Sequence, residues 1–151
     1  MNTHDTFGYG THLILDGFRA DTARLADPSR IAAALEAIVD LMGEAGAGIA
    51  RVQRTRDDGG GISAALVGAE AHVCLHAFPA LHKLSLEAFS TRALPTQAIT
   101  EAVLQRFGVG RHESRVHGRG RLLPRRQDAL ERAVDGDRDY ARLRLRDLLG
   151  A

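Results

Sequence analysis

Residues 70–79 read EAHVCLHAFP, and this stretch decides how the rest of the chain is interpreted. Within it, His72, Cys74 and His76 occupy every second position, which predicts a β-strand over residues 72–78. Successive side chains of a strand point to opposite faces of a sheet, so these three share one face. The fold and the chemistry of the chain are therefore both expected to centre on this strand.

Four more strands are expected around it, over residues 11–18, 49–55, 62–67 and 83–90. The last of these alternates most clearly, with Leu84, Leu86 and Ala88 set against Lys83, Ser85 and Glu87. Residues 56–61 are expected to form a polar turn, in which Gly59, Gly60 and Gly61 suit a hairpin. No Lys-Ser/Thr pair follows these glycines, so a phosphate-binding loop is not expected.

Two helices are predicted between the strands. The first begins at an N-cap Asp27 followed by Pro28, and its apolar residues recur at helical spacing: Ile31, Ala34, Leu35, Ile38 and Met42. Gly43 and Gly46 offer stops for it. The second is predicted from an N-cap at Thr96 to Gly108, with an apolar side formed by Ile99, Val103, Leu104 and Phe107.

The order of these elements predicts an α+β fold, a two-layer sandwich of a mostly antiparallel sheet with helices on one face. A chain of 151 residues suffices for one such domain, placed at residues 1–121. Residues 111–121 read as a basic, extended segment. Residues 122–151 are expected to form a C-terminal helical extension of one or two short helices, interrupted near Asp135-Gly136-Asp137.

Read with Gly10-Thr11-His12-Leu13 and Gly60-Gly61-Ile62-Ser63, residues 70–79 resemble the bacterial and archaeal S-adenosylmethionine decarboxylases. The signature of that family is E-S-H-x-S/T-x-H-T-W-P-E, and the resemblance extends over roughly residues 8 to 120. It implies a homodimer, or a heterodimer with an active relative, with sites near the subunit boundary. A second subunit packed on the uncovered sheet face would give four layers.

Alanine stands at position 71, where the resembled family has a serine. In that family the serine hydroxyl attacks the carbonyl of the preceding glutamate, and elimination of the resulting ester produces an N-terminal pyruvoyl group. This group is the cofactor, because its carbonyl accepts electrons as carbon dioxide leaves. Ala71 has no oxygen with which to attack Glu70, so no pyruvoyl cofactor is expected in this chain.

Other residues of this chain match functional positions of the resembled family. Ser63 matches the serine that assists processing, and His76 matches the histidine that promotes elimination. Thr91 stands where a cysteine is the proton donor, and a threonine is a far weaker acid. Phe78 replaces a tryptophan near the expected substrate pocket, and Ala80 replaces a carboxylate. An engineered trap would change the serine alone, so these additional departures favour natural divergence over the alternative of an engineered Ser-to-Ala precursor.

Three further chemistries remain open at these residues. His72, Cys74 and His76 could bind a metal ion, with His82 or Glu87 as a further ligand, although the resembled family has both histidines without using metal. Cys74 could act as a substitute nucleophile, but it lies three residues past the required bond. Ser63 and His76 could form a nucleophile and base pair, for which the sequence supplies no orienting third group.

Composition restricts the partners and the compartment. The formal net charge is +1, which gives no overall footprint for nucleic acid. Arg111, Arg115, Arg119 and Arg121, with His112 and His117, could bind a polyanion, but a solvated or subunit-facing strand is the favoured interpretation. The single cysteine excludes an internal disulfide, residues 1–10 lack the apolar run of a signal peptide, and no stretch approaches membrane-spanning length. A cytoplasmic protein without membrane partners is expected.

These observations favour a diverged family member of the polyamine pathway that does not self-process. Its expected role is that of a pseudoenzyme that binds an S-adenosylmethionine-like or amine ligand, or regulates an active partner subunit. The alternative is a repurposed enzyme on the same fold.

Overall fold

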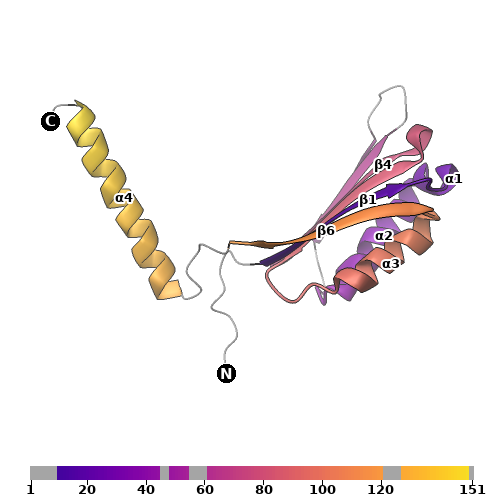
Figure 1. Cartoon of the computed structure of the whole chain (residues 1–151), viewed down its shortest axis with the longest axis horizontal. Coiled ribbons are helices and arrows are strands. Elements are labelled where there is room, and N and C mark those ends of the chain that lie inside the picture. Colours follow the sequence, from indigo (N-terminus) through magenta and orange to yellow (C-terminus); the bar gives the residue numbers. More distant parts are fainter. Residues whose placement is uncertain (1–9, 45–47, 55–60, 121–126, 150–151) are drawn as a thin grey trace. The chain divides into compact units, whose positions relative to one another are not determined.

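The computed structural model describes residues 10–44, 48–54, 61–120 and 127–149 (Figure 1). These residues divide between two compact units, Gly10–Gly118 and a second that includes the C-terminal helix. The predicted domain boundary after residue 121, the stop at Gly46, the glycines at 59 and 60 and Arg121 all lie outside the described residues.

Six strands form a single sheet in the first unit. They are β1 (Gly10–Phe18), β2 (Gly48–Arg54), β3 (Ile62–Val67), β4 (Ala71–Phe78), β5 (Lys83–Ser90) and β6 (Arg111–Arg119), in the spatial order β2-β3-β4-β5-β1-β6. The β2–β3, β3–β4, β4–β5 and β5–β1 pairs are antiparallel. The strand that carries the decisive stretch, β4, therefore lies inside the sheet, and the basic segment forms an edge strand.

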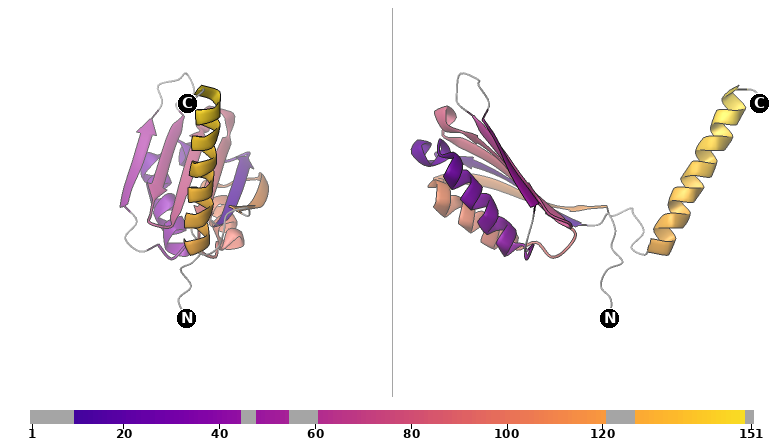
Figure 2. Two further views of the ribbon diagram at one scale, coloured as in Figure 1. Left: turned by 90° about the vertical axis from the view of Figure 1, so that its left-hand side faces the viewer. Right: turned by 180° about the vertical axis from the view of Figure 1, so that it is seen from behind.

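Helices cover one face of this sheet. The two long ones, α2 (Pro28–Leu41) and α3 (Thr96–Phe107), lie on the same face in Figures 1 and 2, together with the single turn α1 (Thr22–Leu25). Strand positions of one parity are buried beneath them, including Leu13 and Leu15 of β1, Val73 and Leu75 of β4, and Leu84 and Leu86 of β5. The α+β two-layer sandwich is confirmed.

The first helix forms as its local sequence predicts. The Asp27 carboxylate accepts hydrogen bonds from the backbone N–H groups of Ser29 and Arg30, which have no partner within the helix. All five residues of the predicted stripe are buried. The helix ends before Gly43, whose φ of +75° is a conformation that glycine adopts without strain.

Thr96 was predicted to be the N-cap of α3, and this is wrong, because Thr96 is the first residue of the helix. The preceding Pro95 supplies no side-chain cap, and the Thr96 carbonyl instead accepts a hydrogen bond from the Thr100 hydroxyl at 2.8 Å. Proline is well suited to a helix start because it has no N–H to leave unpaired. The predicted end at Gly108 is correct, and this glycine has a φ of +59°.

The C-terminal helix α4 (Gln127–Leu149) is continuous, so the predicted interruption near Gly136 is wrong. One glycine in a helix costs about 1 kcal/mol. Two ion pairs lie along the helix: Arg132 with Asp128 precedes Gly136, and Arg138 with Asp135 spans it. Gly136 has no left-handed φ, and a single glycine with this small penalty does not end the helix.

Candidate functional site

Position 71 is the first residue of β4, and its side chain belongs to the helix-facing set. Ala71 is 7% exposed and lies directly opposite Ser90 of β5. Among the described residues, Ser90 is the only buried polar side chain. Its burial follows the alternation that already places Leu84, Leu86 and Ala88 inside, so the sequence held a signal for Ser90 that the motif-based reasoning missed.

The peptide bond between Glu70 and Ala71 is held from the neighbouring strand end. The Glu70 carbonyl accepts a hydrogen bond from the backbone N–H of Thr91 at 3.0 Å. The Glu70 carboxylate forms an ion pair with Arg92, and the Arg92 backbone N–H donates to the Ser90 hydroxyl oxygen at 3.0 Å. The fold thus brings Glu70, Ala71 and Thr91 together and adds Ser90 and Arg92.

The hydrogen-bond pattern places Ala71 and Ser90 in a close pair. The hydrogen bond from the Thr91 N–H to the Glu70 carbonyl makes residues 70 and 91 a hydrogen-bonded pair, so the next pair, Ala71 and Ser90, is a non-hydrogen-bonded pair. In antiparallel sheets the Cα atoms of non-hydrogen-bonded pairs approach most closely, at about 4.5 Å. The Ser90 side chain is therefore the nearest cross-strand neighbour of whatever side chain stands at position 71. In this chain that side chain is only a methyl group.

Ser63 and His76 meet at a different place. They are register partners on β3 and β4, and a hydrogen bond of 2.8 Å joins Ser63 Oγ to His76 Nδ1. Both project from the sheet face that α2 and α3 leave uncovered. His76 is five residues from Ala71, about 16 Å along the strand, and has the opposite parity. Within one chain, the pair does not reach the Glu70–Ala71 bond.

The three candidate metal ligands of β4 also lie apart. His72 stacks on Phe89 with ring centroids 5.4 Å apart, Cys74 is opposite Glu87, and His76 is bonded to Ser63. His72 and His76 are about 13 Å apart along the strand, too far to share one ion. The parts of the chain that the structure describes contain no group of three or more His, Cys, Asp or Glu side chains that could hold a metal.

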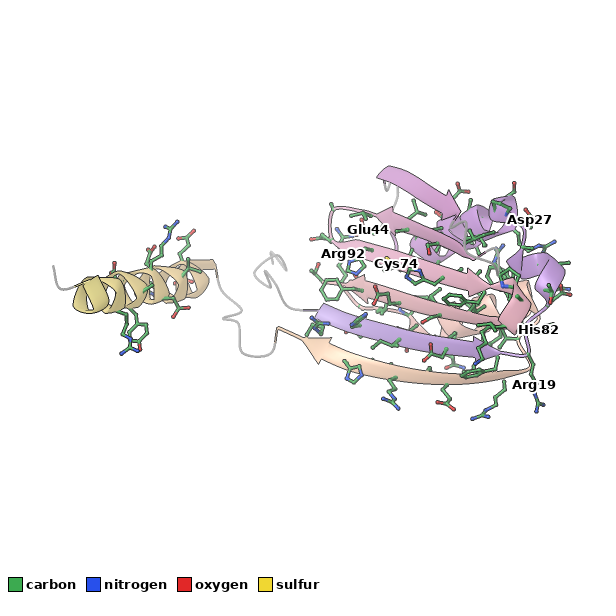
Figure 3. The ribbon with its side chains drawn as sticks, turned by 90° about the horizontal axis from the view of Figure 1, so that it is seen from above. Arg19, Asp27, Glu44, Cys74, His82 and Arg92 are labelled. Atoms are coloured by element: carbon green, nitrogen blue, oxygen red, sulfur yellow. The ribbon has the colours of Figure 1, made fainter. Side chains whose placement is uncertain are left out.

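His82 lies away from His72, Cys74 and His76. It follows the 3-10 turn Pro79–Leu81 in a left-handed conformation, and its Nδ1 lies 2.9 Å from the Thr22 hydroxyl. Figure 3 shows it at the opposite end of the sheet from Arg92. Its contacts tie the end of β4 to α1, which is a structural role.

A family model described as S-adenosylmethionine decarboxylase matches residues 11–120. The chain belongs to the S-adenosylmethionine decarboxylase family. Among solved structures, it is similar to the adenosylmethionine decarboxylase from Aquifex aeolicus VF5, with a TM-score of 0.64 and 17% sequence identity over 75% of this chain and 92% of that one. A search of curated proteins found no significant match.

The family match ends at residue 120, directly after β6 and two residues past the end of the first unit. Helix α4 is therefore an addition to the matched region. No helix in the described part of the chain is both long enough and apolar enough to cross a membrane.

The family assignment leaves the basic strand β6 without a role. Arg111 forms an ion pair with Glu113 at 2.7 Å and lies over the Phe18 ring, 5.5 Å from its centroid. Arg115 and Arg119 share its parity, whereas His112 lies on the other side, toward α3. His117 has this parity too, so all described residues of the predicted ridge except His112 lie on one face of an exposed edge strand.

The Cys74 thiol is a poor nucleophile in this setting. Burial raises the pKa of the thiol above its ordinary value, and the Glu87 carboxylate opposite raises it further. The raised pKa keeps the Cys74 thiol protonated at neutral pH. Since the thiolate is the reactive form, Cys74 is not activated as a nucleophile.

We expect the alkylation rate of Cys74 to rise with pH to a midpoint above that of a free cysteine. Glu87→Gln removes the nearby negative charge and should lower this midpoint, while Glu113→Gln, a carboxylate on the edge strand, should leave it unchanged. The measurement is the rate of reaction with a small neutral alkylating reagent, which reports on one site because Cys74 is the only cysteine. A midpoint below that of free cysteine would contradict the prediction.

Proposed function

We propose that this chain is a family member that does not self-process and acts as a ligand-binding or regulatory pseudoenzyme of the polyamine pathway. The observation that carries the proposal is the methyl group of Ala71 beside an otherwise retained setting. The Glu70 carbonyl is still held by the Thr91 N–H, and Ser63 is still bonded to His76. The hydroxyl that would attack that carbonyl is missing.

The residues present do not fit a pyruvoyl cofactor made from this chain. Forming that group requires a side-chain oxygen at position 71, which becomes the ester oxygen when the peptide bond is broken. Alanine supplies none. Thr91 stands at the position of the family's proton donor and is a far weaker acid than a cysteine thiol, so a second component of the family's chemistry is also weakened.

The separation of the two groups supports assembly with a second subunit. Ser63 and His76 lie on the uncovered face, whereas the Glu70–Ala71 bond lies about 16 Å away along the strand. Two chains packed through their uncovered faces could bring one chain's pair to the other chain's bond. In a heterodimer with an active relative, this chain would contribute Ser63 and His76 to a site whose serine belongs to the partner.

The uncovered face also supports ligand binding. Phe78 is 42% exposed at the end of β4, two positions from His76 and with the same parity. An exposed aromatic ring beside a hydrogen-bonding pair suits a flat heterocycle carrying polar groups. An adenosyl or amine compound is the ligand class that this arrangement and the family together favour.

Thermal unfolding of the full chain with S-adenosylmethionine, its decarboxylated form and common diamines tests this proposal. A ligand at 100 times its Kd stabilises the native state by about 2.7 kcal/mol and should raise Tm by several degrees. Phe78→Ala should reduce the shift. Leu81→Ala, which truncates a 61% exposed residue of the adjoining turn, should not. A flat response across the panel would exclude these ligands and favour a protein partner.

A further inference from the structure

Among the described residues, α4 is the only helix of the second compact unit, so no other helix of that unit covers its apolar side chains. It spans Gln127–Leu149, and every side chain described on it is exposed, including Val134 at 46% and Tyr140 at 65%. Most helical stability in proteins comes from packing an apolar face and not from the intrinsic helix propensity of the residues. The helix therefore requires a partner surface.

The sequence of α4 carries such a face. Apolar residues recur at helical spacing along most of its length, at positions Leu130, Val134, Ala141, Leu145 and Leu148. Asp137 falls on the same stripe near its middle and interrupts it. A narrow stripe of this kind, bordered by charges, suits another helix better than the flat face of a sheet.

Charge is segregated along α4 in a way that identifies the partner. Residues 127–139 contain five carboxylates against two arginines, and residues 140–149 contain three arginines against one carboxylate. A second α4 in parallel orientation would place like charges together. In antiparallel orientation, each acidic half meets a basic half.

We propose that α4 pairs in antiparallel orientation with α4 of a second copy of this chain. Glu131 and Asp135 are one turn apart, as are Arg142 and Arg146, and about three turns separate the two pairs. All four positions therefore fall on one side of the helix. A single register, centred between Arg138 and Asp139, aligns Glu131 with Arg146 of the other copy and Asp135 with Arg142.

The same register aligns the apolar stripes. Leu130 comes within one position of Leu148 of the other copy, and Val134 comes within two positions of Leu145. Charge segregation also suits the dipole of a single helix, which favours acidic residues near its N-terminus. The dipole, however, leaves the apolar stripe in water, and pairing covers it. Antiparallel pairing predicts a defined distance between the α4 helices of two copies, whereas the dipole of a single helix predicts none, so a distance measurement distinguishes the two explanations.

Spin labels on the full chain test the orientation. In a Cys74→Ser background, Tyr140→Cys places a label near the centre of the register and Asp128→Cys places one near the end. Antiparallel pairing predicts a separation of about 10–20 Å between copies at position 140 and more than about 30 Å at position 128, from 1.5 Å per residue. Short distances at both positions would show parallel pairing, and no defined distance at either would show that α4 does not self-associate. Either result would overturn the proposal.

Charge reversal supplies an independent test with the same label at position 140. Arg142→Glu with Arg146→Glu should abolish the short distance, and adding Glu131→Arg with Asp135→Arg should restore it. Arg111→Glu with Arg115→Glu makes the same charge change on β6 and should have no effect. Because the label reports on α4 alone, dimerisation through residues 10–118 does not mask the outcome. Loss without restoration in the fourfold variant would contradict the register.

Discussion

Ala71→Ser is expected to make the chain cleave itself between residues 70 and 71. The change adds one oxygen at a position that is 7% exposed and next to the Ser90 hydroxyl, a group able to hydrogen-bond with it. The Glu70 carbonyl already accepts a hydrogen bond from the Thr91 N–H, which stabilises negative charge on that oxygen during attack. The setting for the first step is therefore present, and only the nucleophile is missing.

Intact mass measurement checks this expectation. The native chain should remain a single species of 16.3 kDa, and the serine variant should give fragments of residues 1–70 and 71–151. The native chain is the matched control, since the two proteins differ by one oxygen. Serine-variant chains that stay intact would show that the other departures block processing as well. Cleavage of the native chain between residues 70 and 71 would contradict the proposed function.

The role of His76 in the elimination step can be tested in the same Ala71→Ser variant. If His76 retains the role that the resemblance gives it, Ala71→Ser should yield a carbonyl-bearing N-terminus, detectable with a hydrazine reagent. Adding His76→Ala should prevent the carbonyl from forming. Glu113→Gln, a change on the edge strand, should not. Equal carbonyl yield with and without His76 would show that this histidine has lost its part in elimination.

Phe107→Ala is expected to destabilise the first unit by about 3–5 kcal/mol, because it empties the volume of a large buried ring. Phe107 is fully buried at the end of α3, and its carbonyl accepts the Asp21 N–H at 2.9 Å. Domains of this size are stabilised by only about 5–15 kcal/mol, so the loss is a large share.

Phe78→Ala is the matched control for this substitution, since it removes the same ring from a site that is 42% exposed and should cost less than about 1 kcal/mol. Urea unfolding measures both, as a shift in midpoint at unchanged slope. Similar losses for the two variants would mean that Phe107 does not anchor the core as described.

At this site, the residues that stabilise the fold differ from the residue that would supply the nucleophile. The core beneath β4 includes Val73, Leu75 and Ala77, whose side chains are hydrocarbons without a nucleophile or a proton donor. An alanine in place of a serine at position 71 differs by one oxygen, leaves that packing intact and makes the buried position apolar. A family member can therefore lose its nucleophile and keep a surface that binds ligands or subunits.

Local sequence signals predicted the elements that local physics controls. The cap at Asp27, the stops at Gly43 and Gly108 and the buried stripe of α2 depend on residues within one or two turns of each other. The short α1 and the turn at Pro79–Leu81 were missed because three or four residues are too few to show a period. Gly136 was misjudged because one glycine costs only about 1 kcal/mol, which is too little to end a helix of 23 residues.

By itself, the sequence determined that position 71 lacks an oxygen and that residues 72–78 alternate as a strand, because covalent structure and side-chain period need no tertiary context. Only the tertiary structure decided which face of that strand the helices bury, that Thr91 and Arg92 hold Glu70, and that Ser63 meets His76. These facts depend on which strands pair, and pairing joins residues far apart in sequence whose mutual packing no local pattern encodes.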